Sequence, residues 1–401
     1  MPAATAAGVA QPGALTVVGS SRLGGGSGAI VLAAARNVFE VTVEEGGVSI
    51  ASVDRNELAA TAQASDARRL QAGGQLTTAG TLSAIAIALR GGTGVVLSHD
   101  VEAASVALSS GGAITQDAGS LRAGQLSGNG NAIDVLGDFS AQGLDVLSNR
   151  TLLVSGRVDG GPSLRLRSGG ELQLSGQLSG ATSWLQAVAG IRQRAGSAIA
   201  ATLLSGSAGG PVALGDAAGF IDNRVVRLGE VTASNGFSFT NGGDLLLVLA
   251  NGSSYSVDAG NSAMFLSVRG NLFQDGRAPL RNGTGTFAAT GQIGTQQNPI
   301  YVTGTGTQTV AAIGAPPAYF NATAVDGSLL DLAGASGFNV PASAFAGRAQ
   351  SSASRTVAFV DLSASGTPYR AFGLVRPGLR LPDDQQPACD AGDPDAVCSP
   401  E

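Results

Sequence analysis

Short segments of the chain alternate apolar and polar residues, as β-strands with one buried face do. In Leu164–Arg167 and in Leu172–Leu174, every second residue is leucine and the residues between are polar. Gly or Ser-Gly steps interrupt these segments too often for a helix to propagate. The pattern therefore predicts many short strands joined by tight turns.

These strand-turn units repeat along the chain. The ten residues Thr151–Gly160 (TLLVSGRVDG) match Glu171–Gly180 (ELQLSGQLSG) at an offset of 20. A longer match pairs Gly111–Gly128 with Val188–Gly206 at an offset of 77, close to four such units. Gly270–Gly276 resembles these as a third, weaker copy. Self-similarity at a fixed short period is typical of a solenoid of stacked coils.

The predicted fold is all-β: a parallel, right-handed β-helix with coils of about 20 residues, since two or three short strands and their glycine turns fill such a unit. Successive coils lie about 4.8 Å apart, and each buries its inner face against its neighbours. The register predicts that Leu152 lies beside Leu172 and Val154 beside Leu174 on the inner face. An antiparallel sandwich would not repeat in this way, and the Leu/Asn framework of a leucine-rich repeat is missing.

The pattern divides the chain into three parts. Residues 1–314 are predicted to form the β-solenoid, with a helical insertion or cap at 55–71. After Ala315–Pro317 the repeat stops and aromatic residues become more frequent, so 315–381 is predicted to be a C-terminal cap, with a second helical candidate at 342–354. Residues 382–401 form an acidic tail.

The composition agrees with a stack of slim side chains and limits the classes of partner that the chain is expected to bind. Glycine accounts for 60 of the 401 residues, and only 4% of residues are aromatic. All 23 basic residues are arginine, and the six acids of the tail account for the whole net charge of −6. A charge-balanced body predicts no nucleic-acid partner. The apolar runs are only strand-sized, so no transmembrane segment is expected.

Catalytic chemistry has little support in the sequence, and no catalytic, metal or cofactor site is expected. His99 is the single histidine, and its neighbour Asp100 would point to the opposite face of a strand. One alternative is a pectinase-like hydrolase, because Asp117, Asp138 and Asp159 are spaced by 21 and 21 residues and would stack if each coil had that length. The residues around them do not align, which favours solvated turn positions.

The two cysteines of the chain lie near its C-terminus. Cys389 and Cys398 enclose eight residues that include a glycine and a proline, which is long enough for a disulfide; two free thiols in the tail are the alternative. Met1–Gly13 lacks the features of a signal peptide, whereas disulfides persist outside the cytosol, so Met1 is interpreted as the start of a fragment of a longer exported protein. Four N-x-(S/T) sequons, which chance alone explains in so Ser- and Thr-rich a chain, begin at Asn149, Asn251, Asn282 and Asn321.

Several features together resemble a known family. The segment Gly291–Val302 (GQIGTQQNPIYV), the GGAITQ-type repeat and the terminal cysteine pair resemble the C-terminal part of filamentous-haemagglutinin-like exoproteins of two-partner secretion, over roughly residues 80–401. Its most specific piece is IGTxxNPI at 293–300. The resemblance implies export through an outer-membrane secretion pore, a secreted or cell-surface location, and a host or surface glycan or protein receptor. It also implies a cysteine loop that holds the protein at its pore.

The expected function is therefore structural and adhesive rather than catalytic: a rod presented for attachment to cells or surfaces. Two alternatives remain open. One is the polysaccharide-active β-helix enzyme with clustered aspartates. The other is an inert fragment of a split adhesin gene, because the family's N-terminal secretion domain is not found in this sequence.

Overall fold

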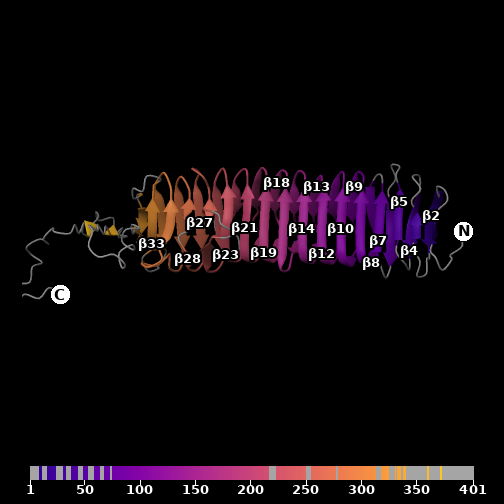
Figure 1. Ribbon diagram of the computed structural model, residues 1–401, viewed down its shortest axis with the longest axis horizontal. Coiled ribbons are helices and arrows are strands. Elements are labelled where there is room, and N and C mark those ends of the chain that lie inside the picture. Colours follow the sequence, from indigo (N-terminus) through magenta and orange to yellow (C-terminus); the bar gives the residue numbers. More distant parts are fainter. Residues whose placement is uncertain are drawn as a thin grey trace, which may run out of the picture.

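The computed structural model describes residues 75–324 apart from 216–222, 250–253, 277–278 and 313–317. Outside that range it describes only strands and isolated residues near the two ends. The described part is an all-β solenoid with no helix, as the sequence predicts. Figure 1 shows the strands side by side along a rod, with β2 near one end and β33 near the other.

Most coils combine one long strand with one short strand. The long strands are β8 (Gln75–Gly91), β10 (Val101–Ser110), β12 (Ser120–Gly130), β14 (Asp138–Ser148), β19 (Gln177–Ala187), β21 (Ala198–Ala208) and β23 (Arg224–Ala233), and in one coil β16 (Arg157–Asp159) and β17 (Ser163–Ser168) take this place. The short strands are β9 (Gly94–Leu97), β11 (Ala113–Gln116), β13 (Ala132–Val135), β15 (Leu152–Val154), β18 (Glu171–Leu174), β20 (Gly190–Gln193), β22 (Val212–Leu214), β24 (Phe237–Asn241), β27 (Met264–Val268), β30 (Gly285–Ala289), β32 (Gln308–Ala312) and β34 (Leu332–Ala335).

The remaining strands lie toward the two ends. Those before residue 75 are β1 (Val9–Ala10), β2 (Thr16–Leu23), β3 (Ile30–Leu32), β4 (Val38–Val43), β5 (Val48–Ser52), β6 (Leu58–Gln63) and β7 (Ala67–Ala72). Those of the C-terminal third are β25 (Leu245–Val248), β26 (Val257–Asp258), β28 (Leu272–Gln274), β29 (Leu280–Arg281), β31 (Ile300–Thr303), β33 (Ala318–Thr323), β35 (Gly337–Asn339), β36 (Phe359–Val360) and β37 (Ala371–Phe372).

Every pairing between coils is parallel, and the predicted register is confirmed. Leu152 of β15 lies opposite Leu172 of β18, and Val154 lies opposite Leu174. All four side chains are buried. The 77-residue offset corresponds to four coils. Gln116 and Gln193 lie in the same column, which runs from β11 through β13, β15 and β18 to β20.

The core consists of columns of identical or similar apolar side chains that run along the rod. One column contains Val95, Ile114, Ile133, Leu152, Leu172 and Ile191, none more than 2% exposed. Within each strand the buried residues alternate with outward-facing ones, as in the burial of β18. This alternation explains why periodicity predicts the strands so well.

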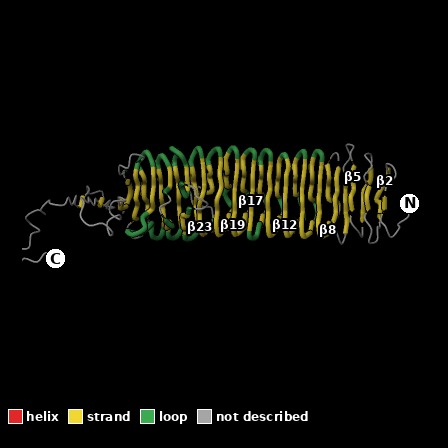
Figure 2. Tube along the Cα trace, in the orientation of Figure 1, coloured by secondary structure: helices red, strands yellow, loops and turns green. Residues whose placement is uncertain are grey.

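Each long strand turns a corner near its middle. In β10 the alternation breaks at Ala104 and Ser105, which are both exposed. The ladder to β12 skips the same position, where Ala104 faces Gly124. The outer surface therefore has one face before the corner and another after it. Figure 2 shows the loops gathered along the long edges of the rod, with the strands between them.

Three expectations are corrected by the strands. The helix expected at 55–71 is wrong, since β6 and β7 occupy this segment and pair in parallel with β4, β5 and β8. Its alanines and leucines favour a helix locally, but stacking on neighbouring coils decides the conformation. The solenoid also extends past residue 314, because β33, β34 and β35 continue the parallel ladders to Asn339.

The third correction concerns the weak repeat copy at Gly270–Gly276. Gln274 pairs with Leu247, in a column that continues from Leu228, and so it is not in the column of Gln116 and Gln193. Beyond the solenoid, β36 and β37 form a separate antiparallel pair in the segment expected to be the cap. The helical candidate at 342–354 and the tail at 382–401 lie outside the described residues.

Candidate binding surface

The three aspartates of the hydrolase alternative are not stacked. Asp138 lies opposite Ser120 in one neighbouring coil and opposite Arg157 in the other. Asp159 lies opposite Ser140, in the next outward column, and Asp117 lies in the turn after β11. Coils here have 18–20 residues, so a spacing of 21 drifts out of register. The three carboxylates therefore do not share one column: Asp138 and Asp159 lie two positions apart on adjacent coils, and Asp117 lies in a turn.

The local role of Asp159 is that of a turn residue. Its Oδ1 accepts a hydrogen bond of 3.0 Å from the backbone N–H of Gly161. Gly161 has a φ of 54°, a left-handed conformation that favours glycine. This agrees with the interpretation of Asp159 as an Asx-turn residue.

His99 and Asp100 each contact a different neighbouring coil. The Nδ1 atom of His99 lies 2.9 Å from the carbonyl oxygen of Thr78. Oδ1 of Asp100 accepts hydrogen bonds from the backbone N–H of Ser120 at 2.8 Å and from its hydroxyl at 2.9 Å. These bonds, the backbone one first, lower the pKa of Asp100. Both residues thus join neighbouring coils, and Oδ1 of Asp100 bonds to Ser120 rather than to the imidazole of His99.

Gln116 and Gln193, which are repeated in the long sequence match, stabilise the turns that follow their strands. Nε2 of Gln116 donates to the carbonyl oxygen of Gly119 at 3.0 Å, and Nε2 of Gln193 donates to that of Ser197 at 3.2 Å. Gln193 also exchanges two amide hydrogen bonds with Asn223, of 2.7 and 2.9 Å. Buried polar groups need such partners, and here they hold the turn that leads from a short strand to a long one. The glutamine motif is therefore explained by folding.

The segment IGTxxNPI also forms a turn between coil strands. Ile293 and Ile300 are fully buried. Between them, the backbone N–H of Thr295 donates to the carbonyl oxygen of Asn298 at 2.9 Å, and Asn298 donates back to the hydroxyl of Thr295 at 2.9 Å. Two buried anchors with a hydrogen-bonded turn between them account for this motif without a ligand.

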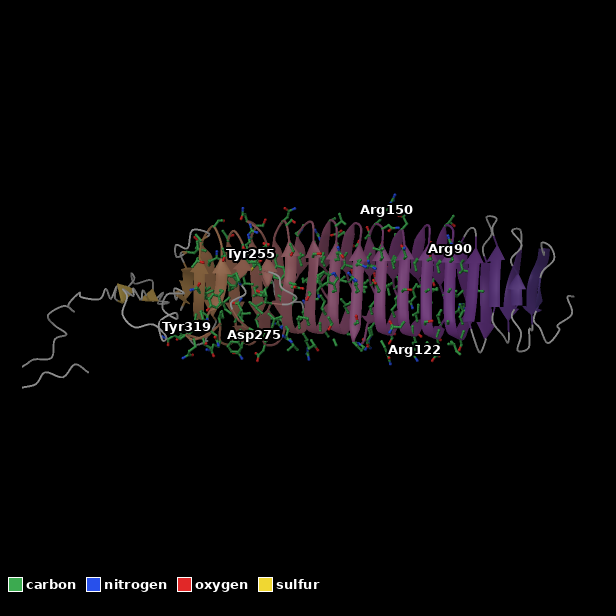
Figure 3. All side chains as sticks on the ribbon, viewed as in Figure 1. Arg90, Arg122, Arg150, Tyr255, Asp275 and Tyr319 are labelled. Carbon is green, nitrogen blue, oxygen red and sulfur yellow. The ribbon has the colours of Figure 1, made fainter. Side chains whose placement is uncertain are left out.

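An elongated groove lies on the outer face that precedes the strand corner. Its volume is about 750 Å³. One side is a polar column of outward-facing residues from five successive coils: Ser83, Glu102, Arg122, Ser140 and Asp159. Figure 3 shows Arg122 at the lower edge of the rod, opposite the edge where Arg150 projects. A second hollow of about 460 Å³ follows on the same face, where the column continues through Ser179 and Ala200 to Arg224.

The groove exists because the corner residues are small. Four small corner residues line it, Ala84, Ala104, Gly124 and Gly161, and Gln142 is the one long side chain at these positions. A Cβ atom on Gly124 would lie 2.6 Å from the carbonyl oxygen of Ala104, so only glycine fits there while the coils keep their spacing. The groove was not predicted from the sequence. The available signal was the recurrence of alanine or glycine at 84, 104 and 124, at the period of the coils.

The charges of the polar column alternate in sign. Glu102, Arg122, Asp159 and Arg224 carry negative, positive, negative and positive charge in that order along the rod. The only large apolar side chain in the first hollow that is strongly exposed is Ile85, at 59%. Such a surface offers many hydrogen-bond donors and acceptors but little net charge.

The sequons differ in accessibility. Asn149 is exposed in the turn after β14. Asn282 is 1% exposed, and its Nδ2 donates to Oε1 of Gln308 at 3.1 Å. Asn321 is 5% exposed, and Asn251 lies outside the described residues. Cys389 and Cys398 also lie outside them, so their disulfide stays a prediction.

Within the part of the chain that the structure describes, His, Cys, Asp and Glu side chains do not gather in groups of three or more that would hold a metal ion. The same part contains no helix long and apolar enough to cross a membrane. Comparison with protein-family models, curated proteins and solved structures gives no match for this chain.

Proposed function

We propose that this chain is a structural and adhesive segment of a secreted bacterial surface exoprotein, which presents a β-solenoid rod for attachment to cells or surfaces. The observation that carries the proposal is the continuous parallel stack, whose inner columns are apolar and whose outer face carries the groove and its polar column. Long solenoids of this kind offer extended surfaces for binding. The resemblance to filamentous-haemagglutinin-like proteins supports the same function, with export through an outer-membrane pore.

The proposal excludes catalysis as the main activity. The polysaccharide-hydrolase alternative depended on Asp117, Asp138 and Asp159 stacking in one column, and the register of Asp138 and Asp159 does not support that stack. Fold alone does not support an enzymatic function, since solenoids host many unrelated ones. The inert-fragment alternative makes the opposite prediction for attachment, so one experiment separates it from adhesion.

Attachment of coated beads tests the proposal. Beads carrying the full chain are applied to epithelial cell layers and to glycan-coated surfaces, and the retained fraction is measured under flow. Retention should exceed that of uncoated beads, and it should be lost in Leu172→Asp, because an unpaired charge in the buried column disrupts the local stack. Beads retained no better than uncoated ones would refute adhesion and favour the inert fragment.

A further inference from the structure

We infer that the groove binds a linear, uncharged glycan that lies parallel to the rod axis, with its sugar units in register with the coils. This inference rests on the proposed adhesive function and assigns it a site and a class of receptor. The site is the polar column Ser83, Glu102, Arg122, Ser140 and Asp159 together with the small-residue floor beside it.

The spacing of the polar column favours a glycan over a peptide. Neighbouring members of the column belong to successive coils, which lie about 4.8 Å apart. One pyranose unit advances an extended glycan by nearly this distance, so successive sugar units meet polar side chains of successive coils. An extended peptide advances about 3.3 Å per residue, or about 6.6 Å per side-chain repeat, and loses register after one coil.

The dimensions agree with an oligosaccharide. The groove spans five coils, which corresponds to about 19 Å along the axis. Its volume of about 750 Å³ lies in the range of established ligand sites, about 300–1,000 Å³. The second hollow on the same face, between Arg157 and Arg224, would extend the path for a longer chain.

The charge pattern indicates an uncharged ligand. A polyanion or a polycation would meet a like charge at every second charged position, because Glu102, Arg122 and Asp159 alternate in sign. Sugar hydroxyls both donate and accept, so they can bond to carboxylates, to the guanidinium group and to serine hydroxyls in turn. Ile85, at the groove margin, offers an apolar contact for the C–H face of a sugar ring.

The test fills the groove without changing the core. Ala104 is exposed on the groove floor, whereas Ala107, on the same strand β10, is exposed on the face beyond the corner. Binding of cellotetraose, chitotetraose and laminaritetraose is measured by titration calorimetry on the full chain. At least one should bind, Ala104→Trp should weaken binding at least about tenfold, and the matched control Ala107→Trp should leave it unchanged. Circular dichroism is used to check that both variants fold.

A second pair of variants keeps the inference testable if Ala104→Trp fails to fold. Arg122→Gln should weaken binding, and Arg165→Gln, an exposed arginine on the other face, should not. Binding should change little between low and high salt. The inference is overturned if no tetrasaccharide binds, if the control variants weaken binding equally, or if only heparin fragments bind. Bead attachment that persists in Ala104→Trp would refute the glycan groove alone, whereas absent attachment in the unmodified chain would refute adhesion itself.

Discussion

Two adjacent leucines of β15 provide a matched test of the core. Leu152 is 0% exposed and lies in the inner column between Ile133 and Leu172. Leu153 points outward and is only partly buried. Truncating each leucine to alanine removes the same atoms from the same strand, so only the side of the sheet differs.

The expected costs follow from burial. Replacing a buried leucine by alanine costs about 2–5 kcal/mol, and the cost is larger where the cavity cannot collapse. Here the backbone hydrogen bonds of Leu152 to both neighbouring coils fix the coil spacing, so we expect Leu152→Ala to cost about 3–5 kcal/mol. Leu153→Ala removes partly exposed apolar surface and should cost about 1 kcal/mol or less.

Hydrogen exchange is the suitable assay, because a solenoid need not unfold in a single step and a global melting curve would average over coils. In Leu152→Ala, amides of β13, β15 and β18 should exchange about 10²- to 10⁴-fold faster, the factor that corresponds to a loss of about 3–5 kcal/mol. Strands at the far end of the rod should change much less. Equal acceleration in Leu152→Ala and Leu153→Ala would refute the assignment of inner and outer columns.

Three further predictions concern single side chains. Burial raises the pKa of Asp134, so its carboxyl stays protonated in the folded chain at pH values where it has ionised in the unfolded chain. Stability should therefore fall as pH rises from the ordinary aspartate pKa toward the raised one. Asp134→Asn should reduce this fall in pH-dependent melting curves. In a host with N-glycosylation, peptide mass spectrometry should find sugar on exposed Asn149 and none on buried Asn282; the reverse would contradict the burial pattern. The purified chain should release no reducing sugar from pectin or glucans, and release that disappears in Asp138→Asn would contradict the adhesive proposal.

The inner columns could be predicted from the sequence because their chemistry repeats. Leu152 and Leu172 occupy equivalent positions and face the same interior, so both are large aliphatic residues. Parallel stacking converts a fixed sequence offset directly into contact, so a 20-residue match fixes a register. The prediction held wherever coil length stayed near that value.

The C-terminal third could not be predicted in the same way because its coils lengthen. Val212 pairs with Phe237, 25 residues later, and Phe237 pairs with Met264 after a further 27. Added loop residues change the offset while leaving the ladder intact, so the sequence match at Gly270–Gly276 does not correspond to a shared column. Loops tolerate such insertions at small thermodynamic cost, which removes the periodic signal without disturbing the fold.

The groove could not be predicted from the sequence for a different reason. Its polar residues come from five coils whose lengths vary between 18 and 20 residues, and they belong to four different residue types. A register error of one residue would place Arg122 inside the core and its neighbours outside. Only the ladder of hydrogen bonds fixes each coil well enough to bring Glu102, Arg122 and Asp159 onto one face.

Residues of the inner columns contribute much more to folding stability than residues of the outer columns. Ligand binding by the groove can therefore be tested with substitutions that leave the fold intact. Exposed charges such as Glu102 and Arg122 contribute little to folding, and surface substitutions usually change stability by less than about 0.5 kcal/mol. Gly124 is different, because its backbone contact with Ala104 forms the floor, and a side chain there would force two coils apart. Loss of glycan binding in Arg122→Gln with unchanged melting would therefore report on recognition, whereas loss in Gly124→Val would report on the corner that creates the groove.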